Sequence, residues 1–199
     1  MSRKNRYNSP LQLKLGEPPR QLSEREISQR LSSVIKSARD IMRKDKGLSG
    51  ELDRLPMLTW IMFLKFLDDI EKLREDSAKL KGETFYPTIE PPYRWRDWAR
   101  KEQGLTGDDL LAFINQEEAV RPDGIRGAGL FAYLRNLTGI EEGDRRDVVA
   151  AVFRGITNRM INGYLLRDVI NLVDKVDFGS SKEIHVLGRF YETMLREMR

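Results

Sequence analysis

The stretch Leu52–Glu71 constrains the fold more than any other part of this chain. Between Met57 and Leu67 nearly every side chain is large and apolar, and only Thr59 and Lys65 interrupt the run. A helix that is apolar on all sides has to be covered from all sides. The run is also far shorter than the roughly 20 residues that a membrane-spanning helix needs. We therefore predict that residues 57–67, approximately, form the central helix of a packed core.

Helical patterns flank this segment on both sides. Ser23 and Glu26 form a capping box, and apolar residues then recur three and four positions apart until Gly47. Residues 83–93 contain three prolines and form an extended connection, after which Tyr93–Trp98 starts a short aromatic helix. Further helices are predicted at about 107–120, 127–138, 144–156, 163–176 and 181–198. Because no convincing strand pattern is present, we expect an all-α fold, a bundle of about seven helices around the central helix.

The first quarter of the chain is much more basic than the rest. Residues 1–50 carry 12 Lys or Arg against 5 Asp or Glu, which leaves 23 basic and 26 acidic residues in the remaining 149. We predict a flexible basic arm over residues 1–21 and one helical domain over residues 22–199. A basic segment suits contact with a polyanion, and it is equally typical of a solvated tail. The absence of cysteine and of an export signal favours a cytoplasmic location.

No catalytic or metal-binding motif is present in the sequence. His185 is the only histidine, and there is no cysteine or second histidine to complete a metal site. Asp68 and Asp69 are adjacent on a helix and point about 100° apart, so we expect them to begin a solvated face. The aromatic block Tyr93–Trp98 is interleaved with arginines and could stack on bases, but a buried core plug is the favoured interpretation.

Three blocks of the sequence carry a resemblance to a known family. Leu52–Glu71, Pro92–Ala99 and Leu172–Glu192 resemble, in order and spacing, signatures of the N-terminal helical domain of the methylation subunit of type I restriction–modification enzymes. Lys182 is a small departure, because an acidic residue is common at that position. The resemblance spans most of the chain.

The resemblance implies a DNA adenine-N6 methyltransferase that depends on S-adenosylmethionine as the full-length protein. Its catalytic domain would carry the cofactor pocket and an Asn-Pro-Pro-Phe/Tyr motif, neither of which is in this chain. The last helical pattern runs to Arg199 without a stop signal, so we expect a fragment of a longer protein. In this segment we therefore expect no catalytic, cofactor-binding or metal-binding residue and no methyltransferase activity.

The resemblance also implies partners for this segment, which would serve as a DNA-clamping and subunit-assembly domain. These are DNA, a specificity subunit, a second methylation subunit and a restriction subunit, and no membrane. The basic first quarter would then supply phosphate contacts, with these candidates foremost: Arg3, Lys4, Arg6, Lys14, Arg20, Arg25 and Arg30. The alternative is a free-standing helical protein-interaction or regulatory module without methyltransferase activity.

Overall fold

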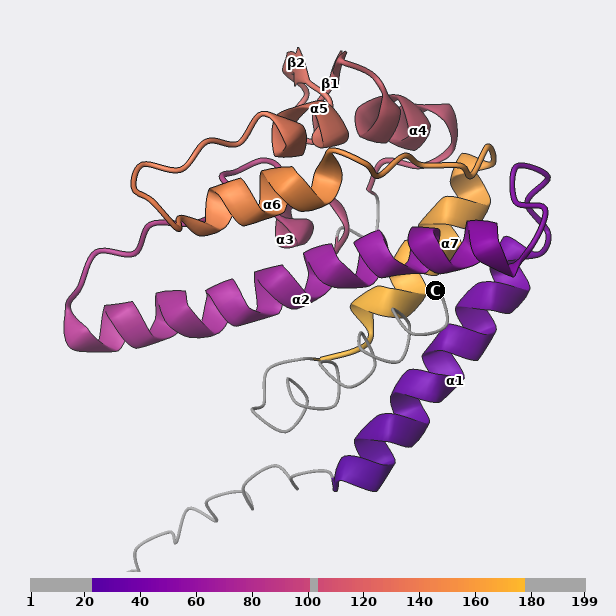
Figure 1. Cartoon of the computed structure of the whole chain (residues 1–199), viewed down its shortest axis with the longest axis horizontal. Helices are drawn as coiled ribbons and strands as arrows, with labels where there is room; N and C mark the ends of the chain where they lie inside the picture. Colours follow the sequence, from indigo (N-terminus) through magenta and orange to yellow (C-terminus); the bar gives the residue numbers. More distant parts are fainter. Residues whose placement is uncertain (1–22, 101–103, 178–199) are drawn as a thin grey trace, which may run out of the picture.

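The structure of the chain, a computed structural model, describes residues 23–100 and 104–177. Seven helices and one small antiparallel hairpin make up this part of the molecule (Figure 1). They are α1 (Glu24–Met42), α2 (Glu51–Lys81), α3 (Trp95–Trp98), α4 (Gly107–Asn115), β1 (Glu118–Val120), β2 (Arg126–Ala128), α5 (Leu130–Arg135), α6 (Arg145–Phe153) and α7 (Gly163–Asp174). The prediction of a helical fold is thus confirmed. Among the described residues, no helix is long and apolar enough to cross a membrane.

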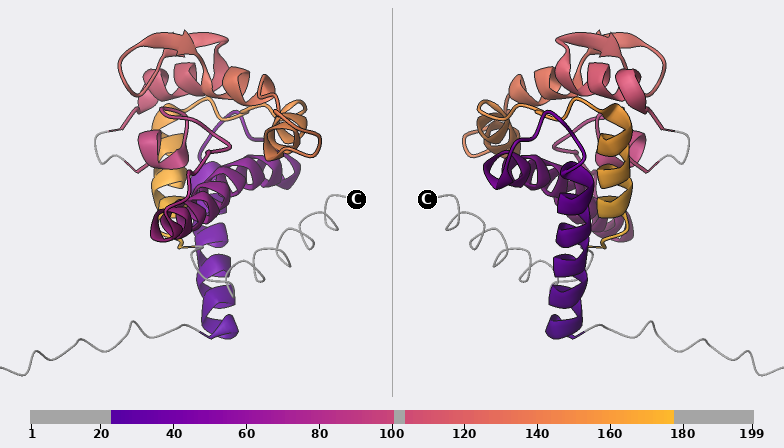
Figure 2. Two further views of the ribbon diagram at one scale, coloured as in Figure 1. Left: turned by 90° about the vertical axis from the view of Figure 1, so that its left-hand side faces the viewer. Right: turned by 90° about the vertical axis from the view of Figure 1, so that its right-hand side faces the viewer.

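Helix α1 begins at the predicted capping box. The Ser23 hydroxyl accepts a hydrogen bond from the backbone N–H of Glu26 at 3.3 Å, and the Glu26 carboxylate accepts one from the Ser23 N–H at 2.8 Å. The apolar side of α1 packs mainly against α7, with Ala38 and Met42 fully buried. The two views of Figure 2 show α1 extending away from the hairpin and α4, which lie at the opposite end of the domain.

Helix α2 runs the length of the domain and holds its core. Trp60 on α2 meets Phe131 on α5 edge to face, with ring centroids 5.1 Å apart. The ring centroids of Phe131 and Phe153 on α6 are 5.4 Å apart, and the Phe153 ring also contacts Phe63 on α2. The prediction of a central helix over residues 57–67 is confirmed, although Phe63, Phe66 and Leu67 are only partly buried. The helix ends at Gly82, whose φ of 69° terminates it.

The hairpin β1–β2 was not predicted from the sequence. The expected helix over 107–120 ends at Asn115, and the one over 127–138 is shortened to α5. Between them lies the sequence Arg-Pro-Asp-Gly, in which Gly124 has a φ of 80° and donates its N–H to the Arg121 carbonyl at 2.9 Å. This is a turn signal that overrides the helical spacing of the surrounding apolar residues. The all-α prediction therefore needs this one local correction.

Several predicted features lie outside the described residues. The basic arm over residues 1–21, the helix over 181–198 and His185 belong to this group. For these residues the interpretation of the sequence remains a prediction.

A cluster of charged side chains joins α2 to α3 and α7. Asp68 accepts a hydrogen bond from Arg96 at 2.8 Å, and Asp69 accepts one from Arg100 at 2.9 Å and pairs with Lys65. Asp68, Asp69 and Lys65 are all buried, so the prediction that the two aspartates begin a solvated face is wrong. The reason is that Arg96 on α3 and Arg100 just after it come from a distant part of the sequence. Helical spacing within α2 cannot reveal such partners.

The cluster continues from α3 to α7 through one carboxylate. Asp174, at the end of α7, accepts a hydrogen bond from the Arg100 guanidinium at 3.1 Å and one from the Trp95 indole N–H at 2.7 Å. Arg96 also reaches Glu75 at 2.9 Å. Three helices that are far apart in the sequence are thus held by shared charges.

Replacement of Leu64 by Ala should lower the free energy of unfolding by about 2–5 kcal/mol, because it opens a cavity in the core. Leu64 is 2% exposed, whereas Leu52 on the same helix is 80% exposed. Leu52→Ala is therefore the matched control and should change stability by no more than about 0.5 kcal/mol. Urea melts of both variants measure the difference. A loss below about 1 kcal/mol for Leu64→Ala would contradict a core position for this side chain.

Replacement of Arg96 by Met should cost about 3–5 kcal/mol at neutral pH, because it leaves the buried Asp68 carboxylate without its partner. Burial raises the pKa of Asp68, and Arg96 opposes this effect. In the variant the folded protein therefore binds a proton at Asp68 more readily than the unfolded chain does. The variant should thus regain stability as the pH falls from 7 towards the ordinary aspartate pKa of 3.8.

The matched control for this pH effect is the double variant Asp68→Asn, Arg96→Met. It has no titrating group at position 68, so the part of the pH dependence due to Asp68 should disappear in urea melts. An equal loss of stability in Arg96→Met at pH 4 and at pH 7 would show that Asp68 does not carry the cost.

Candidate nucleic-acid interface

The outward face of α1 carries a line of basic side chains. Arg25, Lys36 and Arg43 are eleven and seven residues apart, close to whole numbers of helical turns, and all three are exposed. The opposite side of α1 is apolar and packs on the domain, so this line faces solvent along about 27 Å of helix. Along the axis of duplex DNA the phosphates of one strand advance by about 3.4 Å per nucleotide, so a line of this length could reach several of them.

Two of the residues proposed from the sequence as DNA contacts lie on α1. Arg25 and Arg30 are both exposed, but they are five residues apart and so point about 140° away from each other. They cannot follow one straight run of phosphates. The other proposed contacts lie outside the described residues, namely Arg3, Lys4, Arg6, Lys14 and Arg20. Lys36 was missed as a foremost candidate, although its spacing from Arg25 was visible in the sequence.

Acidic neighbours reduce the charge at the end of this line. Arg43 pairs with Asp40 at 2.8 Å and approaches Glu51 to 3.6 Å. Arg39 donates through Nε to Glu51 at 2.7 Å, and this hydrogen bond holds the pKa of Glu51 below its ordinary value. Arg25 and Lys36 are therefore the strongest candidates for phosphate contact among the described residues of α1.

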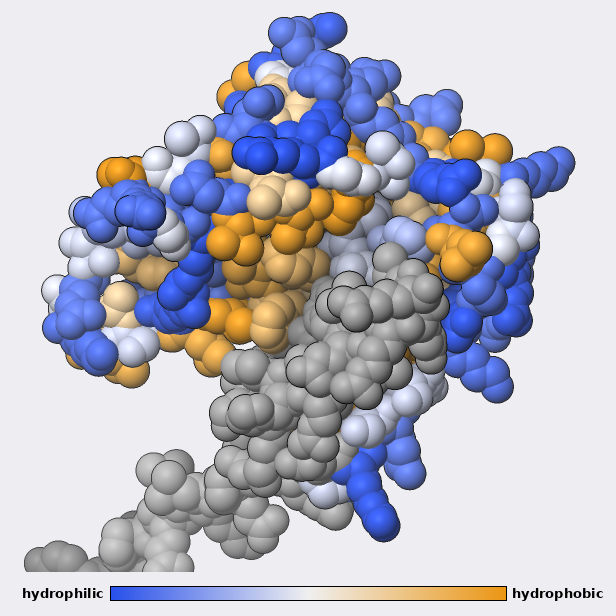
Figure 3. Space-filling view, viewed as in Figure 1, coloured by the Kyte–Doolittle hydropathy of each residue, from blue (hydrophilic) through white to orange (hydrophobic). Residues whose placement is uncertain are grey.

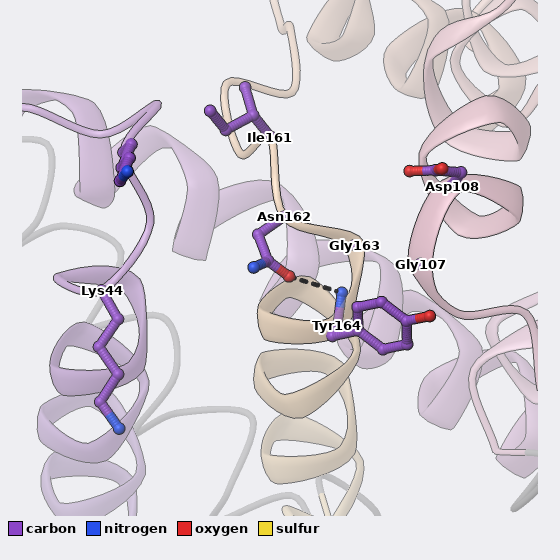
Figure 4. A pocket seen from close by; sticks show the side chains of 8 residues that line it. Lys44, Gly107, Asp108, Ile161, Asn162, Gly163 and Tyr164 are labelled. Carbon is purple, nitrogen blue, oxygen red and sulfur yellow. Dashed lines mark hydrogen bonds between the residues drawn. The ribbon is translucent and has the colours of Figure 1, made fainter.

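A hollow of about 410 Å³ lies where α1 ends and α4 and α7 begin (Figure 4). Three segments line it, namely the loop after α1, the start of α4, and the start of α7 with the residues before it. The lining residues are Lys44, Lys46, Gly107, Asp108, Ile161, Asn162, Gly163 and Tyr164. Asp45 is buried beneath it and accepts hydrogen bonds from the N–H groups of Gly47 at 2.8 Å and Asn162 at 2.9 Å. This carboxylate therefore fixes the loop after α1 to the start of α7.

The two helix starts at this hollow touch through their backbones. A Cβ atom on Gly163 would lie 1.9 Å from the Gly107 carbonyl oxygen, so only glycine fits at position 163. The Asn162 side chain accepts a hydrogen bond from the N–H group of Tyr164 at 3.0 Å (Figure 4) and another from that of Leu165 at 3.1 Å. The first turn of α4 carries Asp108 and Asp109. The Asn162 side chain thus caps the N-terminus of α7, and the two aspartates place negative charge at the positive N-terminal end of α4.

The aromatic block Tyr93–Trp98 is part of the core. Tyr93, Trp95 and Trp98 are all buried, and Trp98 packs edge to face against Phe113 on α4 with centroids 5.9 Å apart. The arginines between them are held by carboxylates; Arg94, for example, forms a bidentate pair with Asp97 at 2.8 and 2.9 Å. The prediction of a core plug is confirmed, and stacking of these rings on bases is excluded.

Among the described residues, the exposed basic side chains of α1 suit the binding of a polyanion. Among residues 23–100 and 104–177, no group of three or more His, Cys, Asp or Glu is placed to hold a metal ion. Lys44, Lys46, Asp108 and Tyr164 line the hollow, and among these described side chains there is no hydrogen-bonded pair of nucleophile and base. The chemistry available on this surface is the attraction of cationic side chains to a polyanion.

Comparison with known proteins gives consistent results. Residues 31–173 match the protein family described as the HsdM N-terminal domain. The methylase subunit of the type I restriction enzyme EcoEI from Escherichia coli is 41% identical over 170 residues, which are 85% of this chain and 31% of that protein. A modification subunit of a putative type I restriction enzyme from Vibrio vulnificus YJ016 has been solved by crystallography. It is 67% identical with a TM-score of 0.82, over 86% of this chain and 36% of that one.

A second solved structure concerns complex assembly and conformational transition of the type I restriction–modification system. One of its chains is 33% identical, with a TM-score of 0.62, over 85% of this chain and 30% of that one. The chain thus spans about a third of the length of the relatives that it matches. The family match begins at Leu31 within α1, so it includes Lys36 and the helices of the core but not Arg25 or Arg30. The chain belongs to the HsdM N-terminal domain family, found in the methylase and modification subunits of type I restriction enzymes.

Proposed function

We propose that this domain holds DNA by its phosphates within a type I modification enzyme and helps to assemble that enzyme. The observation that carries the proposal is the solvent-facing line of Arg25 and Lys36 on α1. It continues the basic character of residues 1–22, which hold Arg3, Lys4, Arg6, Lys14 and Arg20. Phosphate contacts of this kind fix position and add affinity without reading bases. Family membership favours this function over a free-standing adaptor.

The second part of the proposal concerns the activity of the whole protein and is based on its relatives. The EcoEI relative is a methylase subunit of a restriction enzyme, which supports methyl transfer by the whole protein. We propose adenine N6 of DNA as the acceptor and S-adenosylmethionine as the donor. A specificity subunit, a second methylation subunit and a restriction subunit are the proposed partners, in the cytoplasm. The solved relative that concerns complex assembly supports a role among such subunits.

Neutralising the basic line should weaken DNA binding to cognate and non-cognate duplexes alike. In the reconstituted modification enzyme, Arg25→Ala and Lys36→Ala should each flatten the salt dependence of binding by about one unit of logarithmic slope. Arg43→Ala should have less effect, because Arg43 already pairs with Asp40 and Glu51. Fluorescence anisotropy over a range of salt concentrations gives affinity and slope together.

Two further variants make this experiment discriminating. Arg30→Ala tests the other side of α1, and the triple variant Arg3→Ala, Lys4→Ala, Arg6→Ala tests the arm. Arg126→Ala on the hairpin is the control, since this exposed arginine lies at the opposite end of the domain. If Arg25→Ala and Lys36→Ala behave like Arg126→Ala, the line on α1 does not contact phosphates.

The 199-residue chain by itself should bind no S-adenosylmethionine and methylate no DNA, because its sequence holds neither a glycine-rich cofactor loop nor an Asn-Pro-Pro motif. Titration calorimetry with the purified chain should show only the heat of dilution. Saturable binding in the micromolar range would show that this segment contains a cofactor site.

A further inference from the structure

The least covered side of α2 carries a seam that is apolar at five of seven positions, with Thr59 and Ser77 as the exceptions. Its members alternate four and three positions apart, as in a heptad repeat: Thr59, Phe63, Phe66, Ile70, Leu73, Ser77 and Leu80. Exposure increases along the helix, and Leu73 and Leu80 are 43% and 90% exposed. Figure 3 shows apolar surface over the middle of α2, below α6. A repeat of this spacing is the pattern that packs against another helix.

The end of α7 brings the chain to this helix. Asp174 is bound to Arg100 at 3.1 Å, and the same guanidinium is bound to Asp69 on α2 at 2.9 Å. The end of α7 and the middle of α2 are therefore separated by one side chain. Whatever follows residue 177 starts close to the apolar seam.

The sequence after residue 177 is suited to this seam. Residues 181–198 are predicted to form a helix with Ile184, Leu187, Tyr191 and Leu195 on one face, spaced three and four apart. At 1.5 Å per residue such a helix is about 26 Å long, which equals the length of the seam from Phe63 to Leu80. The connection over residues 175–180 is long enough to allow either direction along α2.

We propose that residues 181–198 dock on α2 and pack their apolar face against the seam around Ile70 and Leu73. The segment then serves as an additional helix of the domain, placed by the charges that join α7 to α2. This proposal is independent of DNA binding, because it concerns α2 and leaves the outward face of α1 untouched.

The chain has no cysteine, so engineered pairs can test the docking directly in the 199-residue protein. Ile70→Cys or Leu73→Cys is combined with Leu187→Cys or Tyr191→Cys, and the four pairs allow for a shift of one turn in register. We expect at least one pair to form an intramolecular disulfide several times faster than the control. The control pairs Ile140→Cys with the same two partners, since Ile140 is 80% exposed and lies before α6.

A second measurement does not depend on cysteine pairs. Leu73→Asp should leave the described core intact, because Leu73 is 43% exposed, but it should accelerate tryptic cleavage after Arg189 by about tenfold. Ile140→Asp should leave that cleavage rate unchanged. Equal crosslinking in seam and control pairs, together with equal cleavage of both variants, would overturn the proposal. Disulfide-linked dimers formed by Leu73→Cys alone would also overturn it, since they would place a second copy on the seam.

Discussion

The arrangement of the helices depends on the neutralisation of charges that α2 carries into the core. Lys65, Asp68 and Asp69 are buried together with Glu71 on a helix whose other buried residues are apolar. Charged groups are costly to bury unless partners meet them. Arg96 and Arg100 of the short segment at α3 supply that compensation, and Asp174 of α7 completes it. A helix of four residues has little packing surface of its own. These ion pairs therefore do much to hold α3 between α2 and α7.

Much of this fold could be predicted from the sequence because its signals are local. The capping box at Ser23, the stop at Gly82 and the apolar run Met57–Leu67 of the central helix depend on residues within a few turns of each other. The hairpin was missed, although its Pro-Asp-Gly turn is also local, because the helical spacing on both sides was given more weight. The charges at Asp68 and Asp69 could not be placed, since their partners are about 30 residues away in the sequence.

For the candidate interface, the sequence predicted an excess of basic residues but not which of them lie on one face. The count of basic residues identified the first quarter of the chain, but the geometry of α1 decides which of them act together. This geometry places Arg25 and Arg30 on different sides of the helix and puts Lys36 in line with Arg25. Arg43 lies on the same line, but its pairing with Asp40 and Glu51 reduces the charge that it can offer. Net charge alone therefore overstates the number of cations available to a polyanion, and their spacing on the helix is the more informative quantity.

The backbone contact between the starts of α4 and α7 restricts how this family can vary. The atom that blocks a side chain at Gly163 is the Gly107 carbonyl oxygen, which every amino acid would carry. A second substitution at position 107 therefore cannot create room, and Gly107 is itself restricted by its φ of 57°. Position 163 can change only if one helix is displaced, which would also disturb the loop that Asp45 holds. Mutational paths through this point require several coordinated changes, so the two glycines should persist even where surrounding residues diverge.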